Sequence, residues 1–268
     1  MNYLNAGILF RVFCVFRGKT IMKSAGIDVG SRTVKLVVVE DGRVIYSRKQ
    51  ENSFDSLAVI RNLLDGVAYD AITATGYGRH LFTQHFSSQA ISEIAAFAKG
   101  TRHLFPACRA VLDIGGQDTK AIALDEHGRV RKFEMNDKCA AGTGRFLEIM
   151  ALALGYSLPE FGAAALSGEQ GEKINSMCTV FAESEVISMI SRGAKREQVA
   201  LGIHQAVASR SVAMLQKIAA QGEVAFVGGV ALNPAMRGLV QAALQTTLLT
   251  PDDPQIVGAL GAALHGVS

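Results

Sequence analysis

Ala25-Gly26-Ile27-Asp28-Val29-Gly30-Ser31-Arg32-Thr33-Val34-Lys35 decides the fold, because Ala110-Val111-Leu112-Asp113-Ile114-Gly115-Gly116-Gln117-Asp118-Thr119-Lys120 repeats its plan. Each copy is an apolar strand that ends in a carboxylate and a glycine turn. Internal duplication is the simplest account, and it predicts a chain built of two similar halves. Alanine, aspartate, glycine and lysine coincide at Ala25 and Ala110, Asp28 and Asp113, Gly30 and Gly115, and Lys35 and Lys120.

The surrounding sequence alternates strands and helices, which is typical of an α/β protein. Asp41-Gly42 predicts a tight hairpin between strands at 34–40 and 43–48. A helix at 54–65, a strand at 71–75 and a helix at 89–99 that closes at Gly100 are expected next. The second half predicts strands at 121–124, from the turn at Gly128 to 133, at 223–227 and near 248, and helices at 143–154, 160–166, 180–191, 196–220, from 234 and at 257–265.

Size and charge narrow the class of protein. With 268 residues and 49% hydrophobic side chains, the chain can bury a sizeable core as one large domain or as two lobes. Its formal charge of +3 comes entirely from Arg11, Arg17 and Lys19, because residues 1–21 contain no acid. The remaining chain is neutral and has no basic stripe, so nucleic-acid binding is not expected.

Residues 1–21 differ from the rest of the chain. Their apolar stretch at 8–16 is interrupted by Arg11, is too short to cross a bilayer, and lacks the charge order and cleavage site of a secretory signal. We expect Met22 to be the first residue translated and 1–21 to be an extension. No later segment has the length of a membrane span, so we expect a cytoplasmic protein without membrane contact.

The chain has four cysteines, Cys14, Cys108, Cys139 and Cys178, and none has CxxC spacing. Without an export signal, disulfides are disfavoured, and the roles of ligand, nucleophile or buried apolar side chain remain open. Cys108 stands just ahead of an apolar strand, which favours ordinary packing.

Cys139 lies within Met135-Asn136-Asp137-Lys138-Cys139-Ala140-Ala141-Gly142-Thr143-Gly144-Arg145-Phe146, a small-residue turn ahead of a helix predicted from Thr143. Gly142 and Gly144 let the backbone pass close to another group. A helix start presents unpaired N–H groups with positive partial charge. The turn therefore suits an anionic group, such as a thiolate or a cluster held by thiolates.

The two strand–aspartate–glycine turns, with a later strand that ends in Gly228-Gly229, predict a nucleotide clamp. Each glycine turn lets backbone N–H groups approach phosphate oxygens, and Ser31 and Thr33 add hydroxyl donors. Of Asp28 and Asp113, one carboxylate would hold Mg²⁺ through water and the other would orient an attacking water. The alternative is that an Asp-Gly turn merely ends a strand; two copies with matching lysines favour the clamp.

These motifs resemble the actin/hexokinase/Hsp70 superfamily of ATPases. Within it, the chain is similar to the activator ATPases of 2-hydroxyacyl-CoA dehydratases, which are akin to the ATPase subunits of benzoyl-CoA reductase. The resemblance covers Met22 to the C-terminus. It rests on GIDVGS at 26–31, ATGYGR at 74–79, DIGGQD at 113–118, MNDKCAAGTGRF at 135–146, CTVFAESEVIS at 178–188 and GGV at 228–230.

The resemblance implies a two-lobed actin-like ATPase fold, with duplicated ribonuclease H-like lobes and mixed sheets. We assign 22–105 to the first lobe and 106–254 to the second, with the C-terminal helix at 255–268 expected to pack back on the first. ATP or ADP with Mg²⁺ is the expected ligand. Asp28 and Asp113 would be catalytic, and the nucleotide would be bound by Gly30, Ser31, Thr33, Lys35, Gly115, Gly116, Gln117, Gly228, Gly229 and Gln255. Arg32 and Val34 depart from the family's usual small or hydroxyl residues in the first turn.

The same resemblance implies one [4Fe-4S] cluster per homodimer, with Cys139 and Cys178 supplying two thiolates from each subunit. The residues agree, because a four-thiolate cluster needs four ligands and a twofold mate completes the set. The implied activity is ATP hydrolysis that closes the lobes and drives one low-potential electron to a partner dehydratase or reductase. A ferredoxin or flavodoxin would be the electron donor.

Other readings remain open at this stage. The chain could be the ATPase subunit of a benzoyl-CoA reductase-like enzyme, a small-molecule kinase with the same clamp, or a nucleotide-dependent scaffold whose cysteines bind zinc or nothing. His204 is expected to be packed or to cap a helix rather than to be catalytic. Glu183 and Glu185 would either support the cysteine site or lie on a solvated helix face.

Overall fold

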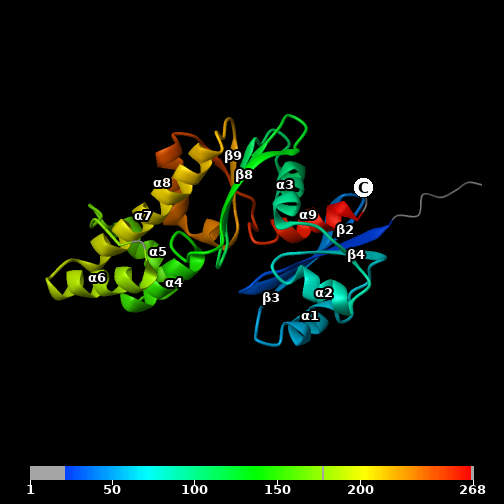
Figure 1. The fold of residues 1–268 in the computed structure, drawn as a ribbon, viewed down its shortest axis with the longest axis horizontal. Helices are drawn as coiled ribbons and strands as arrows, with labels where there is room; N and C mark the ends of the chain where they lie inside the picture. Colours follow the sequence, from blue (N-terminus) through cyan, green and yellow to red (C-terminus); the bar gives the residue numbers. More distant parts are fainter. Residues whose placement is uncertain (1–21, 177, 267–268) are drawn as a thin grey trace, which may run out of the picture.

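The computed structural model describes residues 22–176 and 178–266 (Figure 1). The expected extension at 1–21, including Cys14, lies outside the described residues. Two five-stranded sheets are present, with strand orders β3-β2-β1-β4-β5 and β10-β9-β6-β7-β8. Read from its other edge, the second sheet matches the first strand for strand. The predicted α/β class and duplication are therefore confirmed.

The first sheet begins as an antiparallel meander of β1 (Lys23–Val29), β2 (Thr33–Glu40) and β3 (Arg43–Glu51). Asp41 and Gly42 have φ of 49° and 74°, the left-handed values that a tight two-residue hairpin requires. Next to β1, β4 and β5 pair in parallel and make the sheet mixed. The remaining elements of this half are β4 (Ala71–Thr75), β5 (Gln89–Ala90), α1 (Ser56–Leu64) and α2 (Arg79–His85).

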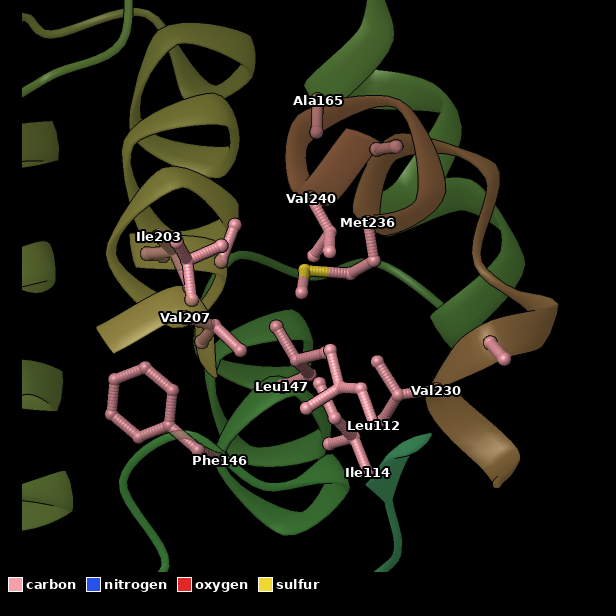
Figure 2. Close-up of a cluster of buried hydrophobic side chains, with 14 of the residues drawn as sticks. Leu112, Ile114, Phe146, Leu147, Ala165, Ile203, Val207, Val230, Met236 and Val240 are labelled. Carbon is pink, nitrogen blue, oxygen red and sulfur yellow. The ribbon is translucent and has the colours of Figure 1, made fainter. Parts of the chain in front are cut away.

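The second sheet has the same mixed pairing, with β6 antiparallel to β7 and parallel to β9. One of its faces is covered by a large helical layer, where Leu112 and Ile114 of β6 lie against Leu147 of α4 (Figure 2). The strands are β6 (Ala110–Ile114), β7 (Thr119–Leu124), β8 (Val130–Asn136), β9 (Val224–Val227) and β10 (Leu248–Leu249). The helices are α4 (Gly144–Ala153), α5 (Leu158–Ser167), α6 (Thr179–Ser191), α7 (Arg196–Lys217), the short 3-10 helix η1 (Gly229–Leu232) and α8 (Pro234–Leu244).

The two halves also share a shift of strand register, of the kind that a β-bulge produces, at equivalent positions of their sheets. The β2–β3 pairing shifts register between Val38 and Val39, and the β7–β8 pairing shifts between Ala123 and Leu124. These are matched positions of the two copies. Both halves thus share a backbone distortion that their residue identities do not reveal, because a bulge is a property of strand geometry.

Two helices are exchanged between the sheets. Helix α3 (Glu93–Leu104) follows the first sheet in the chain but buries Phe97 and Ala98 against the second. Helix α9 (Val257–His265) follows the second sheet but buries Leu260 and its neighbours against β2 of the first. The two helices also pack on each other between the sheets (Figure 1).

The expected end of a helix at Gly100 is wrong, because α3 begins at Glu93 and continues through Gly100 to Leu104. Gly100 is buried where α3 crosses α9. A Cβ atom there would overlap the carbonyl oxygen of Val257, and a Cβ on Gly261 would overlap that of Ala96. Glycine therefore permits a close helix crossing at this position, whereas the sequence pattern favours a helix stop.

Among the described residues, no single helix has the length and apolar composition to cross a membrane; α4 and α5, bent by 80° relative to each other, meet that criterion only as a pair.

Candidate functional site

Each copy of the repeat forms an aspartate–lysine pair in which the aspartate is buried. Strand pairing places Asp28 opposite Lys35 and Asp113 opposite Lys120, within the side-chain reach of a cross-strand pair. In both pairs the lysine Nζ lies 3.1 Å from the aspartate Oδ2. The two predicted catalytic aspartates therefore occupy equivalent positions, each at the carboxyl end of a central strand and each with a lysine beside it.

A glycine lies behind each aspartate and repeats the symmetry. Gly76, after β4, has φ of 90°, and Gly228, after β9, has φ of 86°. A Cβ on Gly76 would lie 2.5 Å from Asp28 Oδ1, and one on Gly228 would overlap Asp113 Oδ1. Because L side chains rarely adopt this backbone conformation, both positions admit only glycine without displacing a carboxylate.

The two predicted phosphate turns have the same internal hydrogen bond. Gly30 N–H donates to Thr33 O at 3.2 Å, and Gly115 N–H donates to Asp118 O at 2.9 Å. Ser31 and Gln117 are exposed at the tips of the turns. The turn residues predicted from sequence are therefore brought together as two sets: Gly30, Ser31, Thr33 and Lys35 in one, and Gly115, Gly116 and Gln117 in the other.

The third predicted segment is also assembled. Gly228 N–H donates to Pro254 O at 2.9 Å, and Gln255 Nε2 lies 3.5 Å from the position that a Cβ on Gly229 would take. Lys49 of β3 reaches the same segment, with Nζ at 2.9 Å from Gln255 Oε1 and at 2.8 Å from Asp253 Oδ2. Sequence reasoning missed Lys49, because the exposed β3 strand gave no sign of this distant contact.

Charge is concentrated around Lys120, which is 2% exposed. Its Nζ contacts Asp113 at 3.1 Å, Asp118 at 2.6 Å and Glu93 at 2.8 Å. Although burial lowers the pKa of Lys120, the three carboxylates raise it above its ordinary value. Burial raises the pKa of Asp113 to about 6, against the attraction of Lys120, because this single cation is shared among three anions.

Asp113 also has an oxygen without a partner. Within the described residues, its Oδ1 is buried and accepts no hydrogen bond. A buried polar atom of this kind is rare unless water, an ion or a ligand completes it. The carboxylate chemistry and the unpaired oxygen therefore fit a hydrated Mg²⁺ or an oriented water molecule at the second turn.

Cys139 lies in an exposed turn that is held by hydrogen bonds on both sides. Asn136 Nδ2 donates to Cys139 O at 2.9 Å and to Ala141 O at 3.0 Å. Thr119 Oγ1 of β7 donates to Gly142 O at 2.7 Å, and Gly142 has φ of 87°. The predicted small-residue turn is thus attached directly to the second phosphate turn.

Cys178 is the exposed N-cap residue of α6. The segment before it is held by Glu185, whose carboxylate accepts from Asn175 N–H at 3.0 Å and from Ser176 N–H at 2.8 Å. Although burial acts to raise the pKa of Glu185, these hydrogen bonds lower it below its ordinary value. Glu185 therefore supports the cysteine segment, whereas Glu183 lies exposed on the helix surface.

The cysteines divide into two kinds. Cys108 is buried, and its Sγ contacts Ala110 O at 3.0 Å, so the prediction of ordinary packing is confirmed; burial raises its pKa. Cys139 and Cys178 are free and exposed. Across residues 22–176 and 178–266, no group of three or more His, Cys, Asp or Glu side chains is arranged to hold a metal ion. The described part of one chain therefore offers two exposed thiols, which fits half of a four-thiolate site.

A model of the BadF/BadG/BcrA/BcrD ATPase family matches residues 25–266. The chain belongs to this ATPase family. It is 41% identical over 255 residues to the activator of lactoyl-CoA dehydratase from Anaerotignum propionicum, covering 91% of this chain and 97% of that protein.

The fold of this chain is similar both to the solved structure of a close relative and to that of a more distant protein. The activator of the 2-hydroxyisocaproyl-CoA dehydratase from Clostridium difficile, with bound ADPNP, superposes with a TM-score of 0.84 at 38% identity over 91% of this chain and 94% of that chain. A ROK family glucokinase from Streptomyces griseus has a TM-score of 0.58 at 14% identity over 91% of this chain and 98% of that chain. The second likeness shows the fold alone. The predicted actin-like ATPase fold is confirmed.

In this BadF/BadG/BcrA/BcrD ATPase, His204 is a core residue as expected. It is fully buried, its Nδ1 lies 2.7 Å from Ala200 O, and Asn233 Nδ2 lies 3.0 Å from its Nε2. Because the amide nitrogen must donate to Nε2, the proton of the neutral ring is on Nδ1. Burial lowers the pKa of His204, which keeps the ring neutral.

Sequence reasoning missed two partners in the site of this ATPase. Glu93 reaches Lys120 from the first turn of α3, and Glu148 of α4 pairs with Arg32 of the first turn at 3.3 Å. No local pattern reveals either contact, because both are made between elements that are distant in the chain. The sequence could have identified Asp118 as a further partner of Lys120, since it stands two residues before Lys120 on the same strand–turn unit.

Proposed function

We propose that this chain is an ATP-dependent activator of a 2-hydroxyacyl-CoA dehydratase, and that it couples ATP hydrolysis to low-potential electron transfer from a [4Fe-4S] cluster shared by two copies. The supporting relatives are named as activators of lactoyl-CoA and 2-hydroxyisocaproyl-CoA dehydratases. The second was solved with ADPNP bound. The fold-level likeness to a sugar kinase gives no comparable support to the kinase reading, since its identity is 14%.

The nucleotide would lie between the two glycine turns. Backbone N–H groups of Gly116 and Gln117 would face its phosphates, with Ser31 and Thr33 adding hydroxyl donors, while the N–H groups of Gly30 and Gly115 close the two turns internally. Gly228, Gly229 and Gln255 would contact the adenosine, because the hydrogen bond from Gly228 to Pro254 and the approach of the Gln255 side chain to Gly229 bring the three residues together.

The two aspartates would divide the chemistry between them. Asp28 would hold Mg²⁺ through water, and the ion would supply neutralisation of phosphate charge. Asp113 would orient the attacking water and accept its proton at Oδ1, the oxygen that has no partner among the described residues. Its pKa, raised to about 6 by burial, supports this role, because a general base works best when its pKa is near the working pH.

Cys139 and Cys178 of each of two copies would hold the cluster, which supplies a low-potential electron when bound. Cys178 caps the N-terminus of α6, where the helix dipole stabilises negative charge. Glu185 would keep the Cys178 segment in place through Asn175 and Ser176. Both thiols are exposed, as sharing between two chains requires.

The observation that carries the coupling is a direct connection between the second turn and the cysteine turn. Gly144 N–H donates to Gly115 O and Arg145 N–H donates to Gly116 O, both at 2.8 Å. These two residues begin α4, directly after the Cys139 turn. A displacement of the second turn by nucleotide would therefore move the start of α4 and the Cys139 turn with it.

The test is iron and sulfide analysis of anaerobically purified protein, combined with its ATPase rate. The unaltered dimer should contain about four iron and four sulfide per two chains, and Cys139→Ser and Cys178→Ser should each lose most of both. Cys108→Ala is the matched control, because Cys108 is buried in the core, and it should keep its iron. A Cys139→Ser variant with full iron and sulfide would contradict the cluster assignment.

Activity with a partner tests the remaining part. The protein should activate a purified 2-hydroxyacyl-CoA dehydratase only when ATP and a reduced ferredoxin or flavodoxin are both present. Phosphate transfer to a small-molecule acceptor at the rate of ATP loss would instead support the kinase reading.

A further inference from the structure

We propose that Arg32 distinguishes a nucleoside triphosphate from a diphosphate by exchanging its ion pair with Glu148 for the terminal phosphate. This inference rests on the proposed function only for the position of the nucleotide between the two glycine turns. It concerns a charged residue of the first turn, between Ser31 and Thr33. Arg32 would be a specificity-determining residue, separate from the two aspartates.

The backbone of Arg32 is fixed to the first sheet. Its carbonyl oxygen accepts from Asn52 N–H at 2.8 Å, and Asn52 Nδ2 donates to Gly30 O at 2.7 Å. Asn52 thus joins the first turn at two points to the segment that follows β3. The base of the Arg32 side chain therefore has a defined position, and only the side chain beyond it needs to move.

The side chain extends from the first turn onto the second. A Cβ built on Gly116 would lie 2.6 Å from Arg32 Cγ and 3.2 Å from Arg32 Cβ. Only glycine at 116 leaves room for this contact, so the arginine stem crosses the second phosphate turn. The guanidinium is consequently placed beside the two turns that are proposed to hold the phosphates.

The present partner of the guanidinium is weakly held. Arg32 Nη2 lies 3.3 Å from Glu148 Oε1, and the Arg32 side chain is 52% exposed. Exposed ion pairs of this kind contribute little to stability and are screened by salt. A terminal phosphate presents more charge and several acceptor oxygens, and arginine binds such groups with two parallel hydrogen bonds. Exchange toward the phosphate is therefore favoured when a triphosphate is bound.

Glu148 gives the exchange a consequence inside the protein. It lies in α4, where Arg145 Nη1 also contacts it at 3.0 Å, and α4 begins at the residues that bond the second turn. Loss of Arg32 from Glu148 removes a link between the first turn and α4 while the Arg145 pair, which is internal to the helix, remains. Arg32 thus connects the nucleotide state to the helix that follows Cys139.

The experiment is calorimetric titration of the full chain with ADP and with ADPNP, each with Mg²⁺. Arg32→Thr should weaken ADPNP binding about tenfold or more and ADP binding less than about twofold, as expected for loss of a charge-assisted contact to one phosphate. The ADPNP affinity of Arg32→Lys should lie between those of the unaltered chain and Arg32→Thr, because lysine keeps the charge but cannot make two parallel hydrogen bonds. Arg129→Thr is the matched control, since Arg129 pairs with Asp125 at an exposed turn, and it should change neither affinity.

Glu148→Gln completes the test. It should tighten ADPNP binding about twofold to fivefold by removing the competing carboxylate, and this gain should vanish in a chain that also carries Arg32→Thr. Equal weakening of ADP and ADPNP by Arg32→Thr would overturn the proposal, as would tighter ADPNP binding, which would make Arg32 an obstruction. Failure of the unaltered chain to bind either nucleotide would contradict the proposed function as well.

Discussion

Lys35 of the first turn contacts one carboxylate, whereas Lys120 of the second contacts three. The two side chains are 14% and 2% exposed. The backbone around them is the same in both halves, down to the glycine with positive φ and the bulge in the neighbouring ladder. Duplication has therefore preserved the geometry of the turns while their charge environments have diverged.

The exchanged helices explain how the environments diverged. Helix α3 directs Glu93 at Lys120, while the equivalent helix α9 presents Gly258 near Asp28, with a Cβ there only 3.4 Å from Asp28 Oδ2. One helix adds a carboxylate and the other adds no side chain. The first turn is left with a simple pair, and the second becomes a buried cluster with an unpaired oxygen.

The largest difference between the halves should appear when the lysines are removed. Lys120→Met leaves three carboxylates around one site without a cation and should lower the free energy of unfolding by about 3–5 kcal/mol. Lys35→Met leaves only Asp28 and should lower it by about 1–2 kcal/mol. Urea unfolding of both variants measures this. Equal losses would show that the additional carboxylates of the second half carry no energetic weight.

The pH dependence of stability should report the second turn. The pKa of Asp113 is about 6 in the folded chain against 3.8 for an ordinary aspartate, so between these pH values the folded state holds a proton that the unfolded state has lost. The contribution of Asp113 to stability should therefore fall as pH rises through this window, by up to about 3 kcal/mol, and level off above it. Unfolding measured across pH 4–7 for the native chain and Asp113→Asn tests this. Parallel profiles for the two proteins would refute it.

Three glycine variants should separate backbone strain from steric conflict. Gly66, Gly76 and Gly228 have φ of 72°, 90° and 86°, but Gly66 has open space where a Cβ would stand. Gly66→Ala should cost about 1 kcal/mol, whereas Gly76→Ala and Gly228→Ala should each cost about 2–3 kcal/mol because the methyl group also meets an aspartate. Thermal unfolding compares them. Similar losses at all three positions would mean that the aspartates move aside without penalty.

The smallest effect is expected at the surface link between Lys49 and Asp253. Both side chains are more than a quarter exposed, at 39% and 33%. Lys49→Met should change the free energy of unfolding by less than about 1 kcal/mol, and the change should shrink at high salt. If urea unfolding instead shows a loss of free energy above about 1 kcal/mol that does not shrink at high salt, the Lys49–Asp253 pair stabilises the fold as strongly as the aspartate–lysine pairs of the two turns.

The two turns could be predicted from the sequence because each is formed by residues that are close together in the chain. The fixed spacing of aspartate, glycine and lysine is the one that places the aspartate of one strand opposite the lysine of the next, so this pairing could be inferred from the repeat. The Asp41-Gly42 hairpin is a similar case, because its positive φ values are those that these residues favour. The assignments of catalytic, nucleotide and cluster roles to these residues stay predictions.

The features that the sequence did not predict depend on distant contacts. Gly100 was read as a helix end, but its absence of a side chain serves the crossing of α3 and α9. Helix α2 was not expected, and the contacts of Glu93 with Lys120 and of Glu148 with Arg32 have no local signal. The helix crossing and the Glu93 contact arise from the exchange of helices between sheets, and the Glu148 contact joins α4 of the second half to the first turn; a pattern along the chain encodes neither.

The position of α9 has a consequence for synthesis on the ribosome. The first sheet is translated early, yet its face at Gly26, Val37 and Val39 is covered by a helix that begins only at Val257. Domains commonly fold in order of emergence from the ribosome, but here the earliest sheet must wait for the last helix. Nascent chains that stop before Val257 would present this uncovered apolar surface of the first sheet to chaperones and proteases, although every strand of the second sheet has already been made.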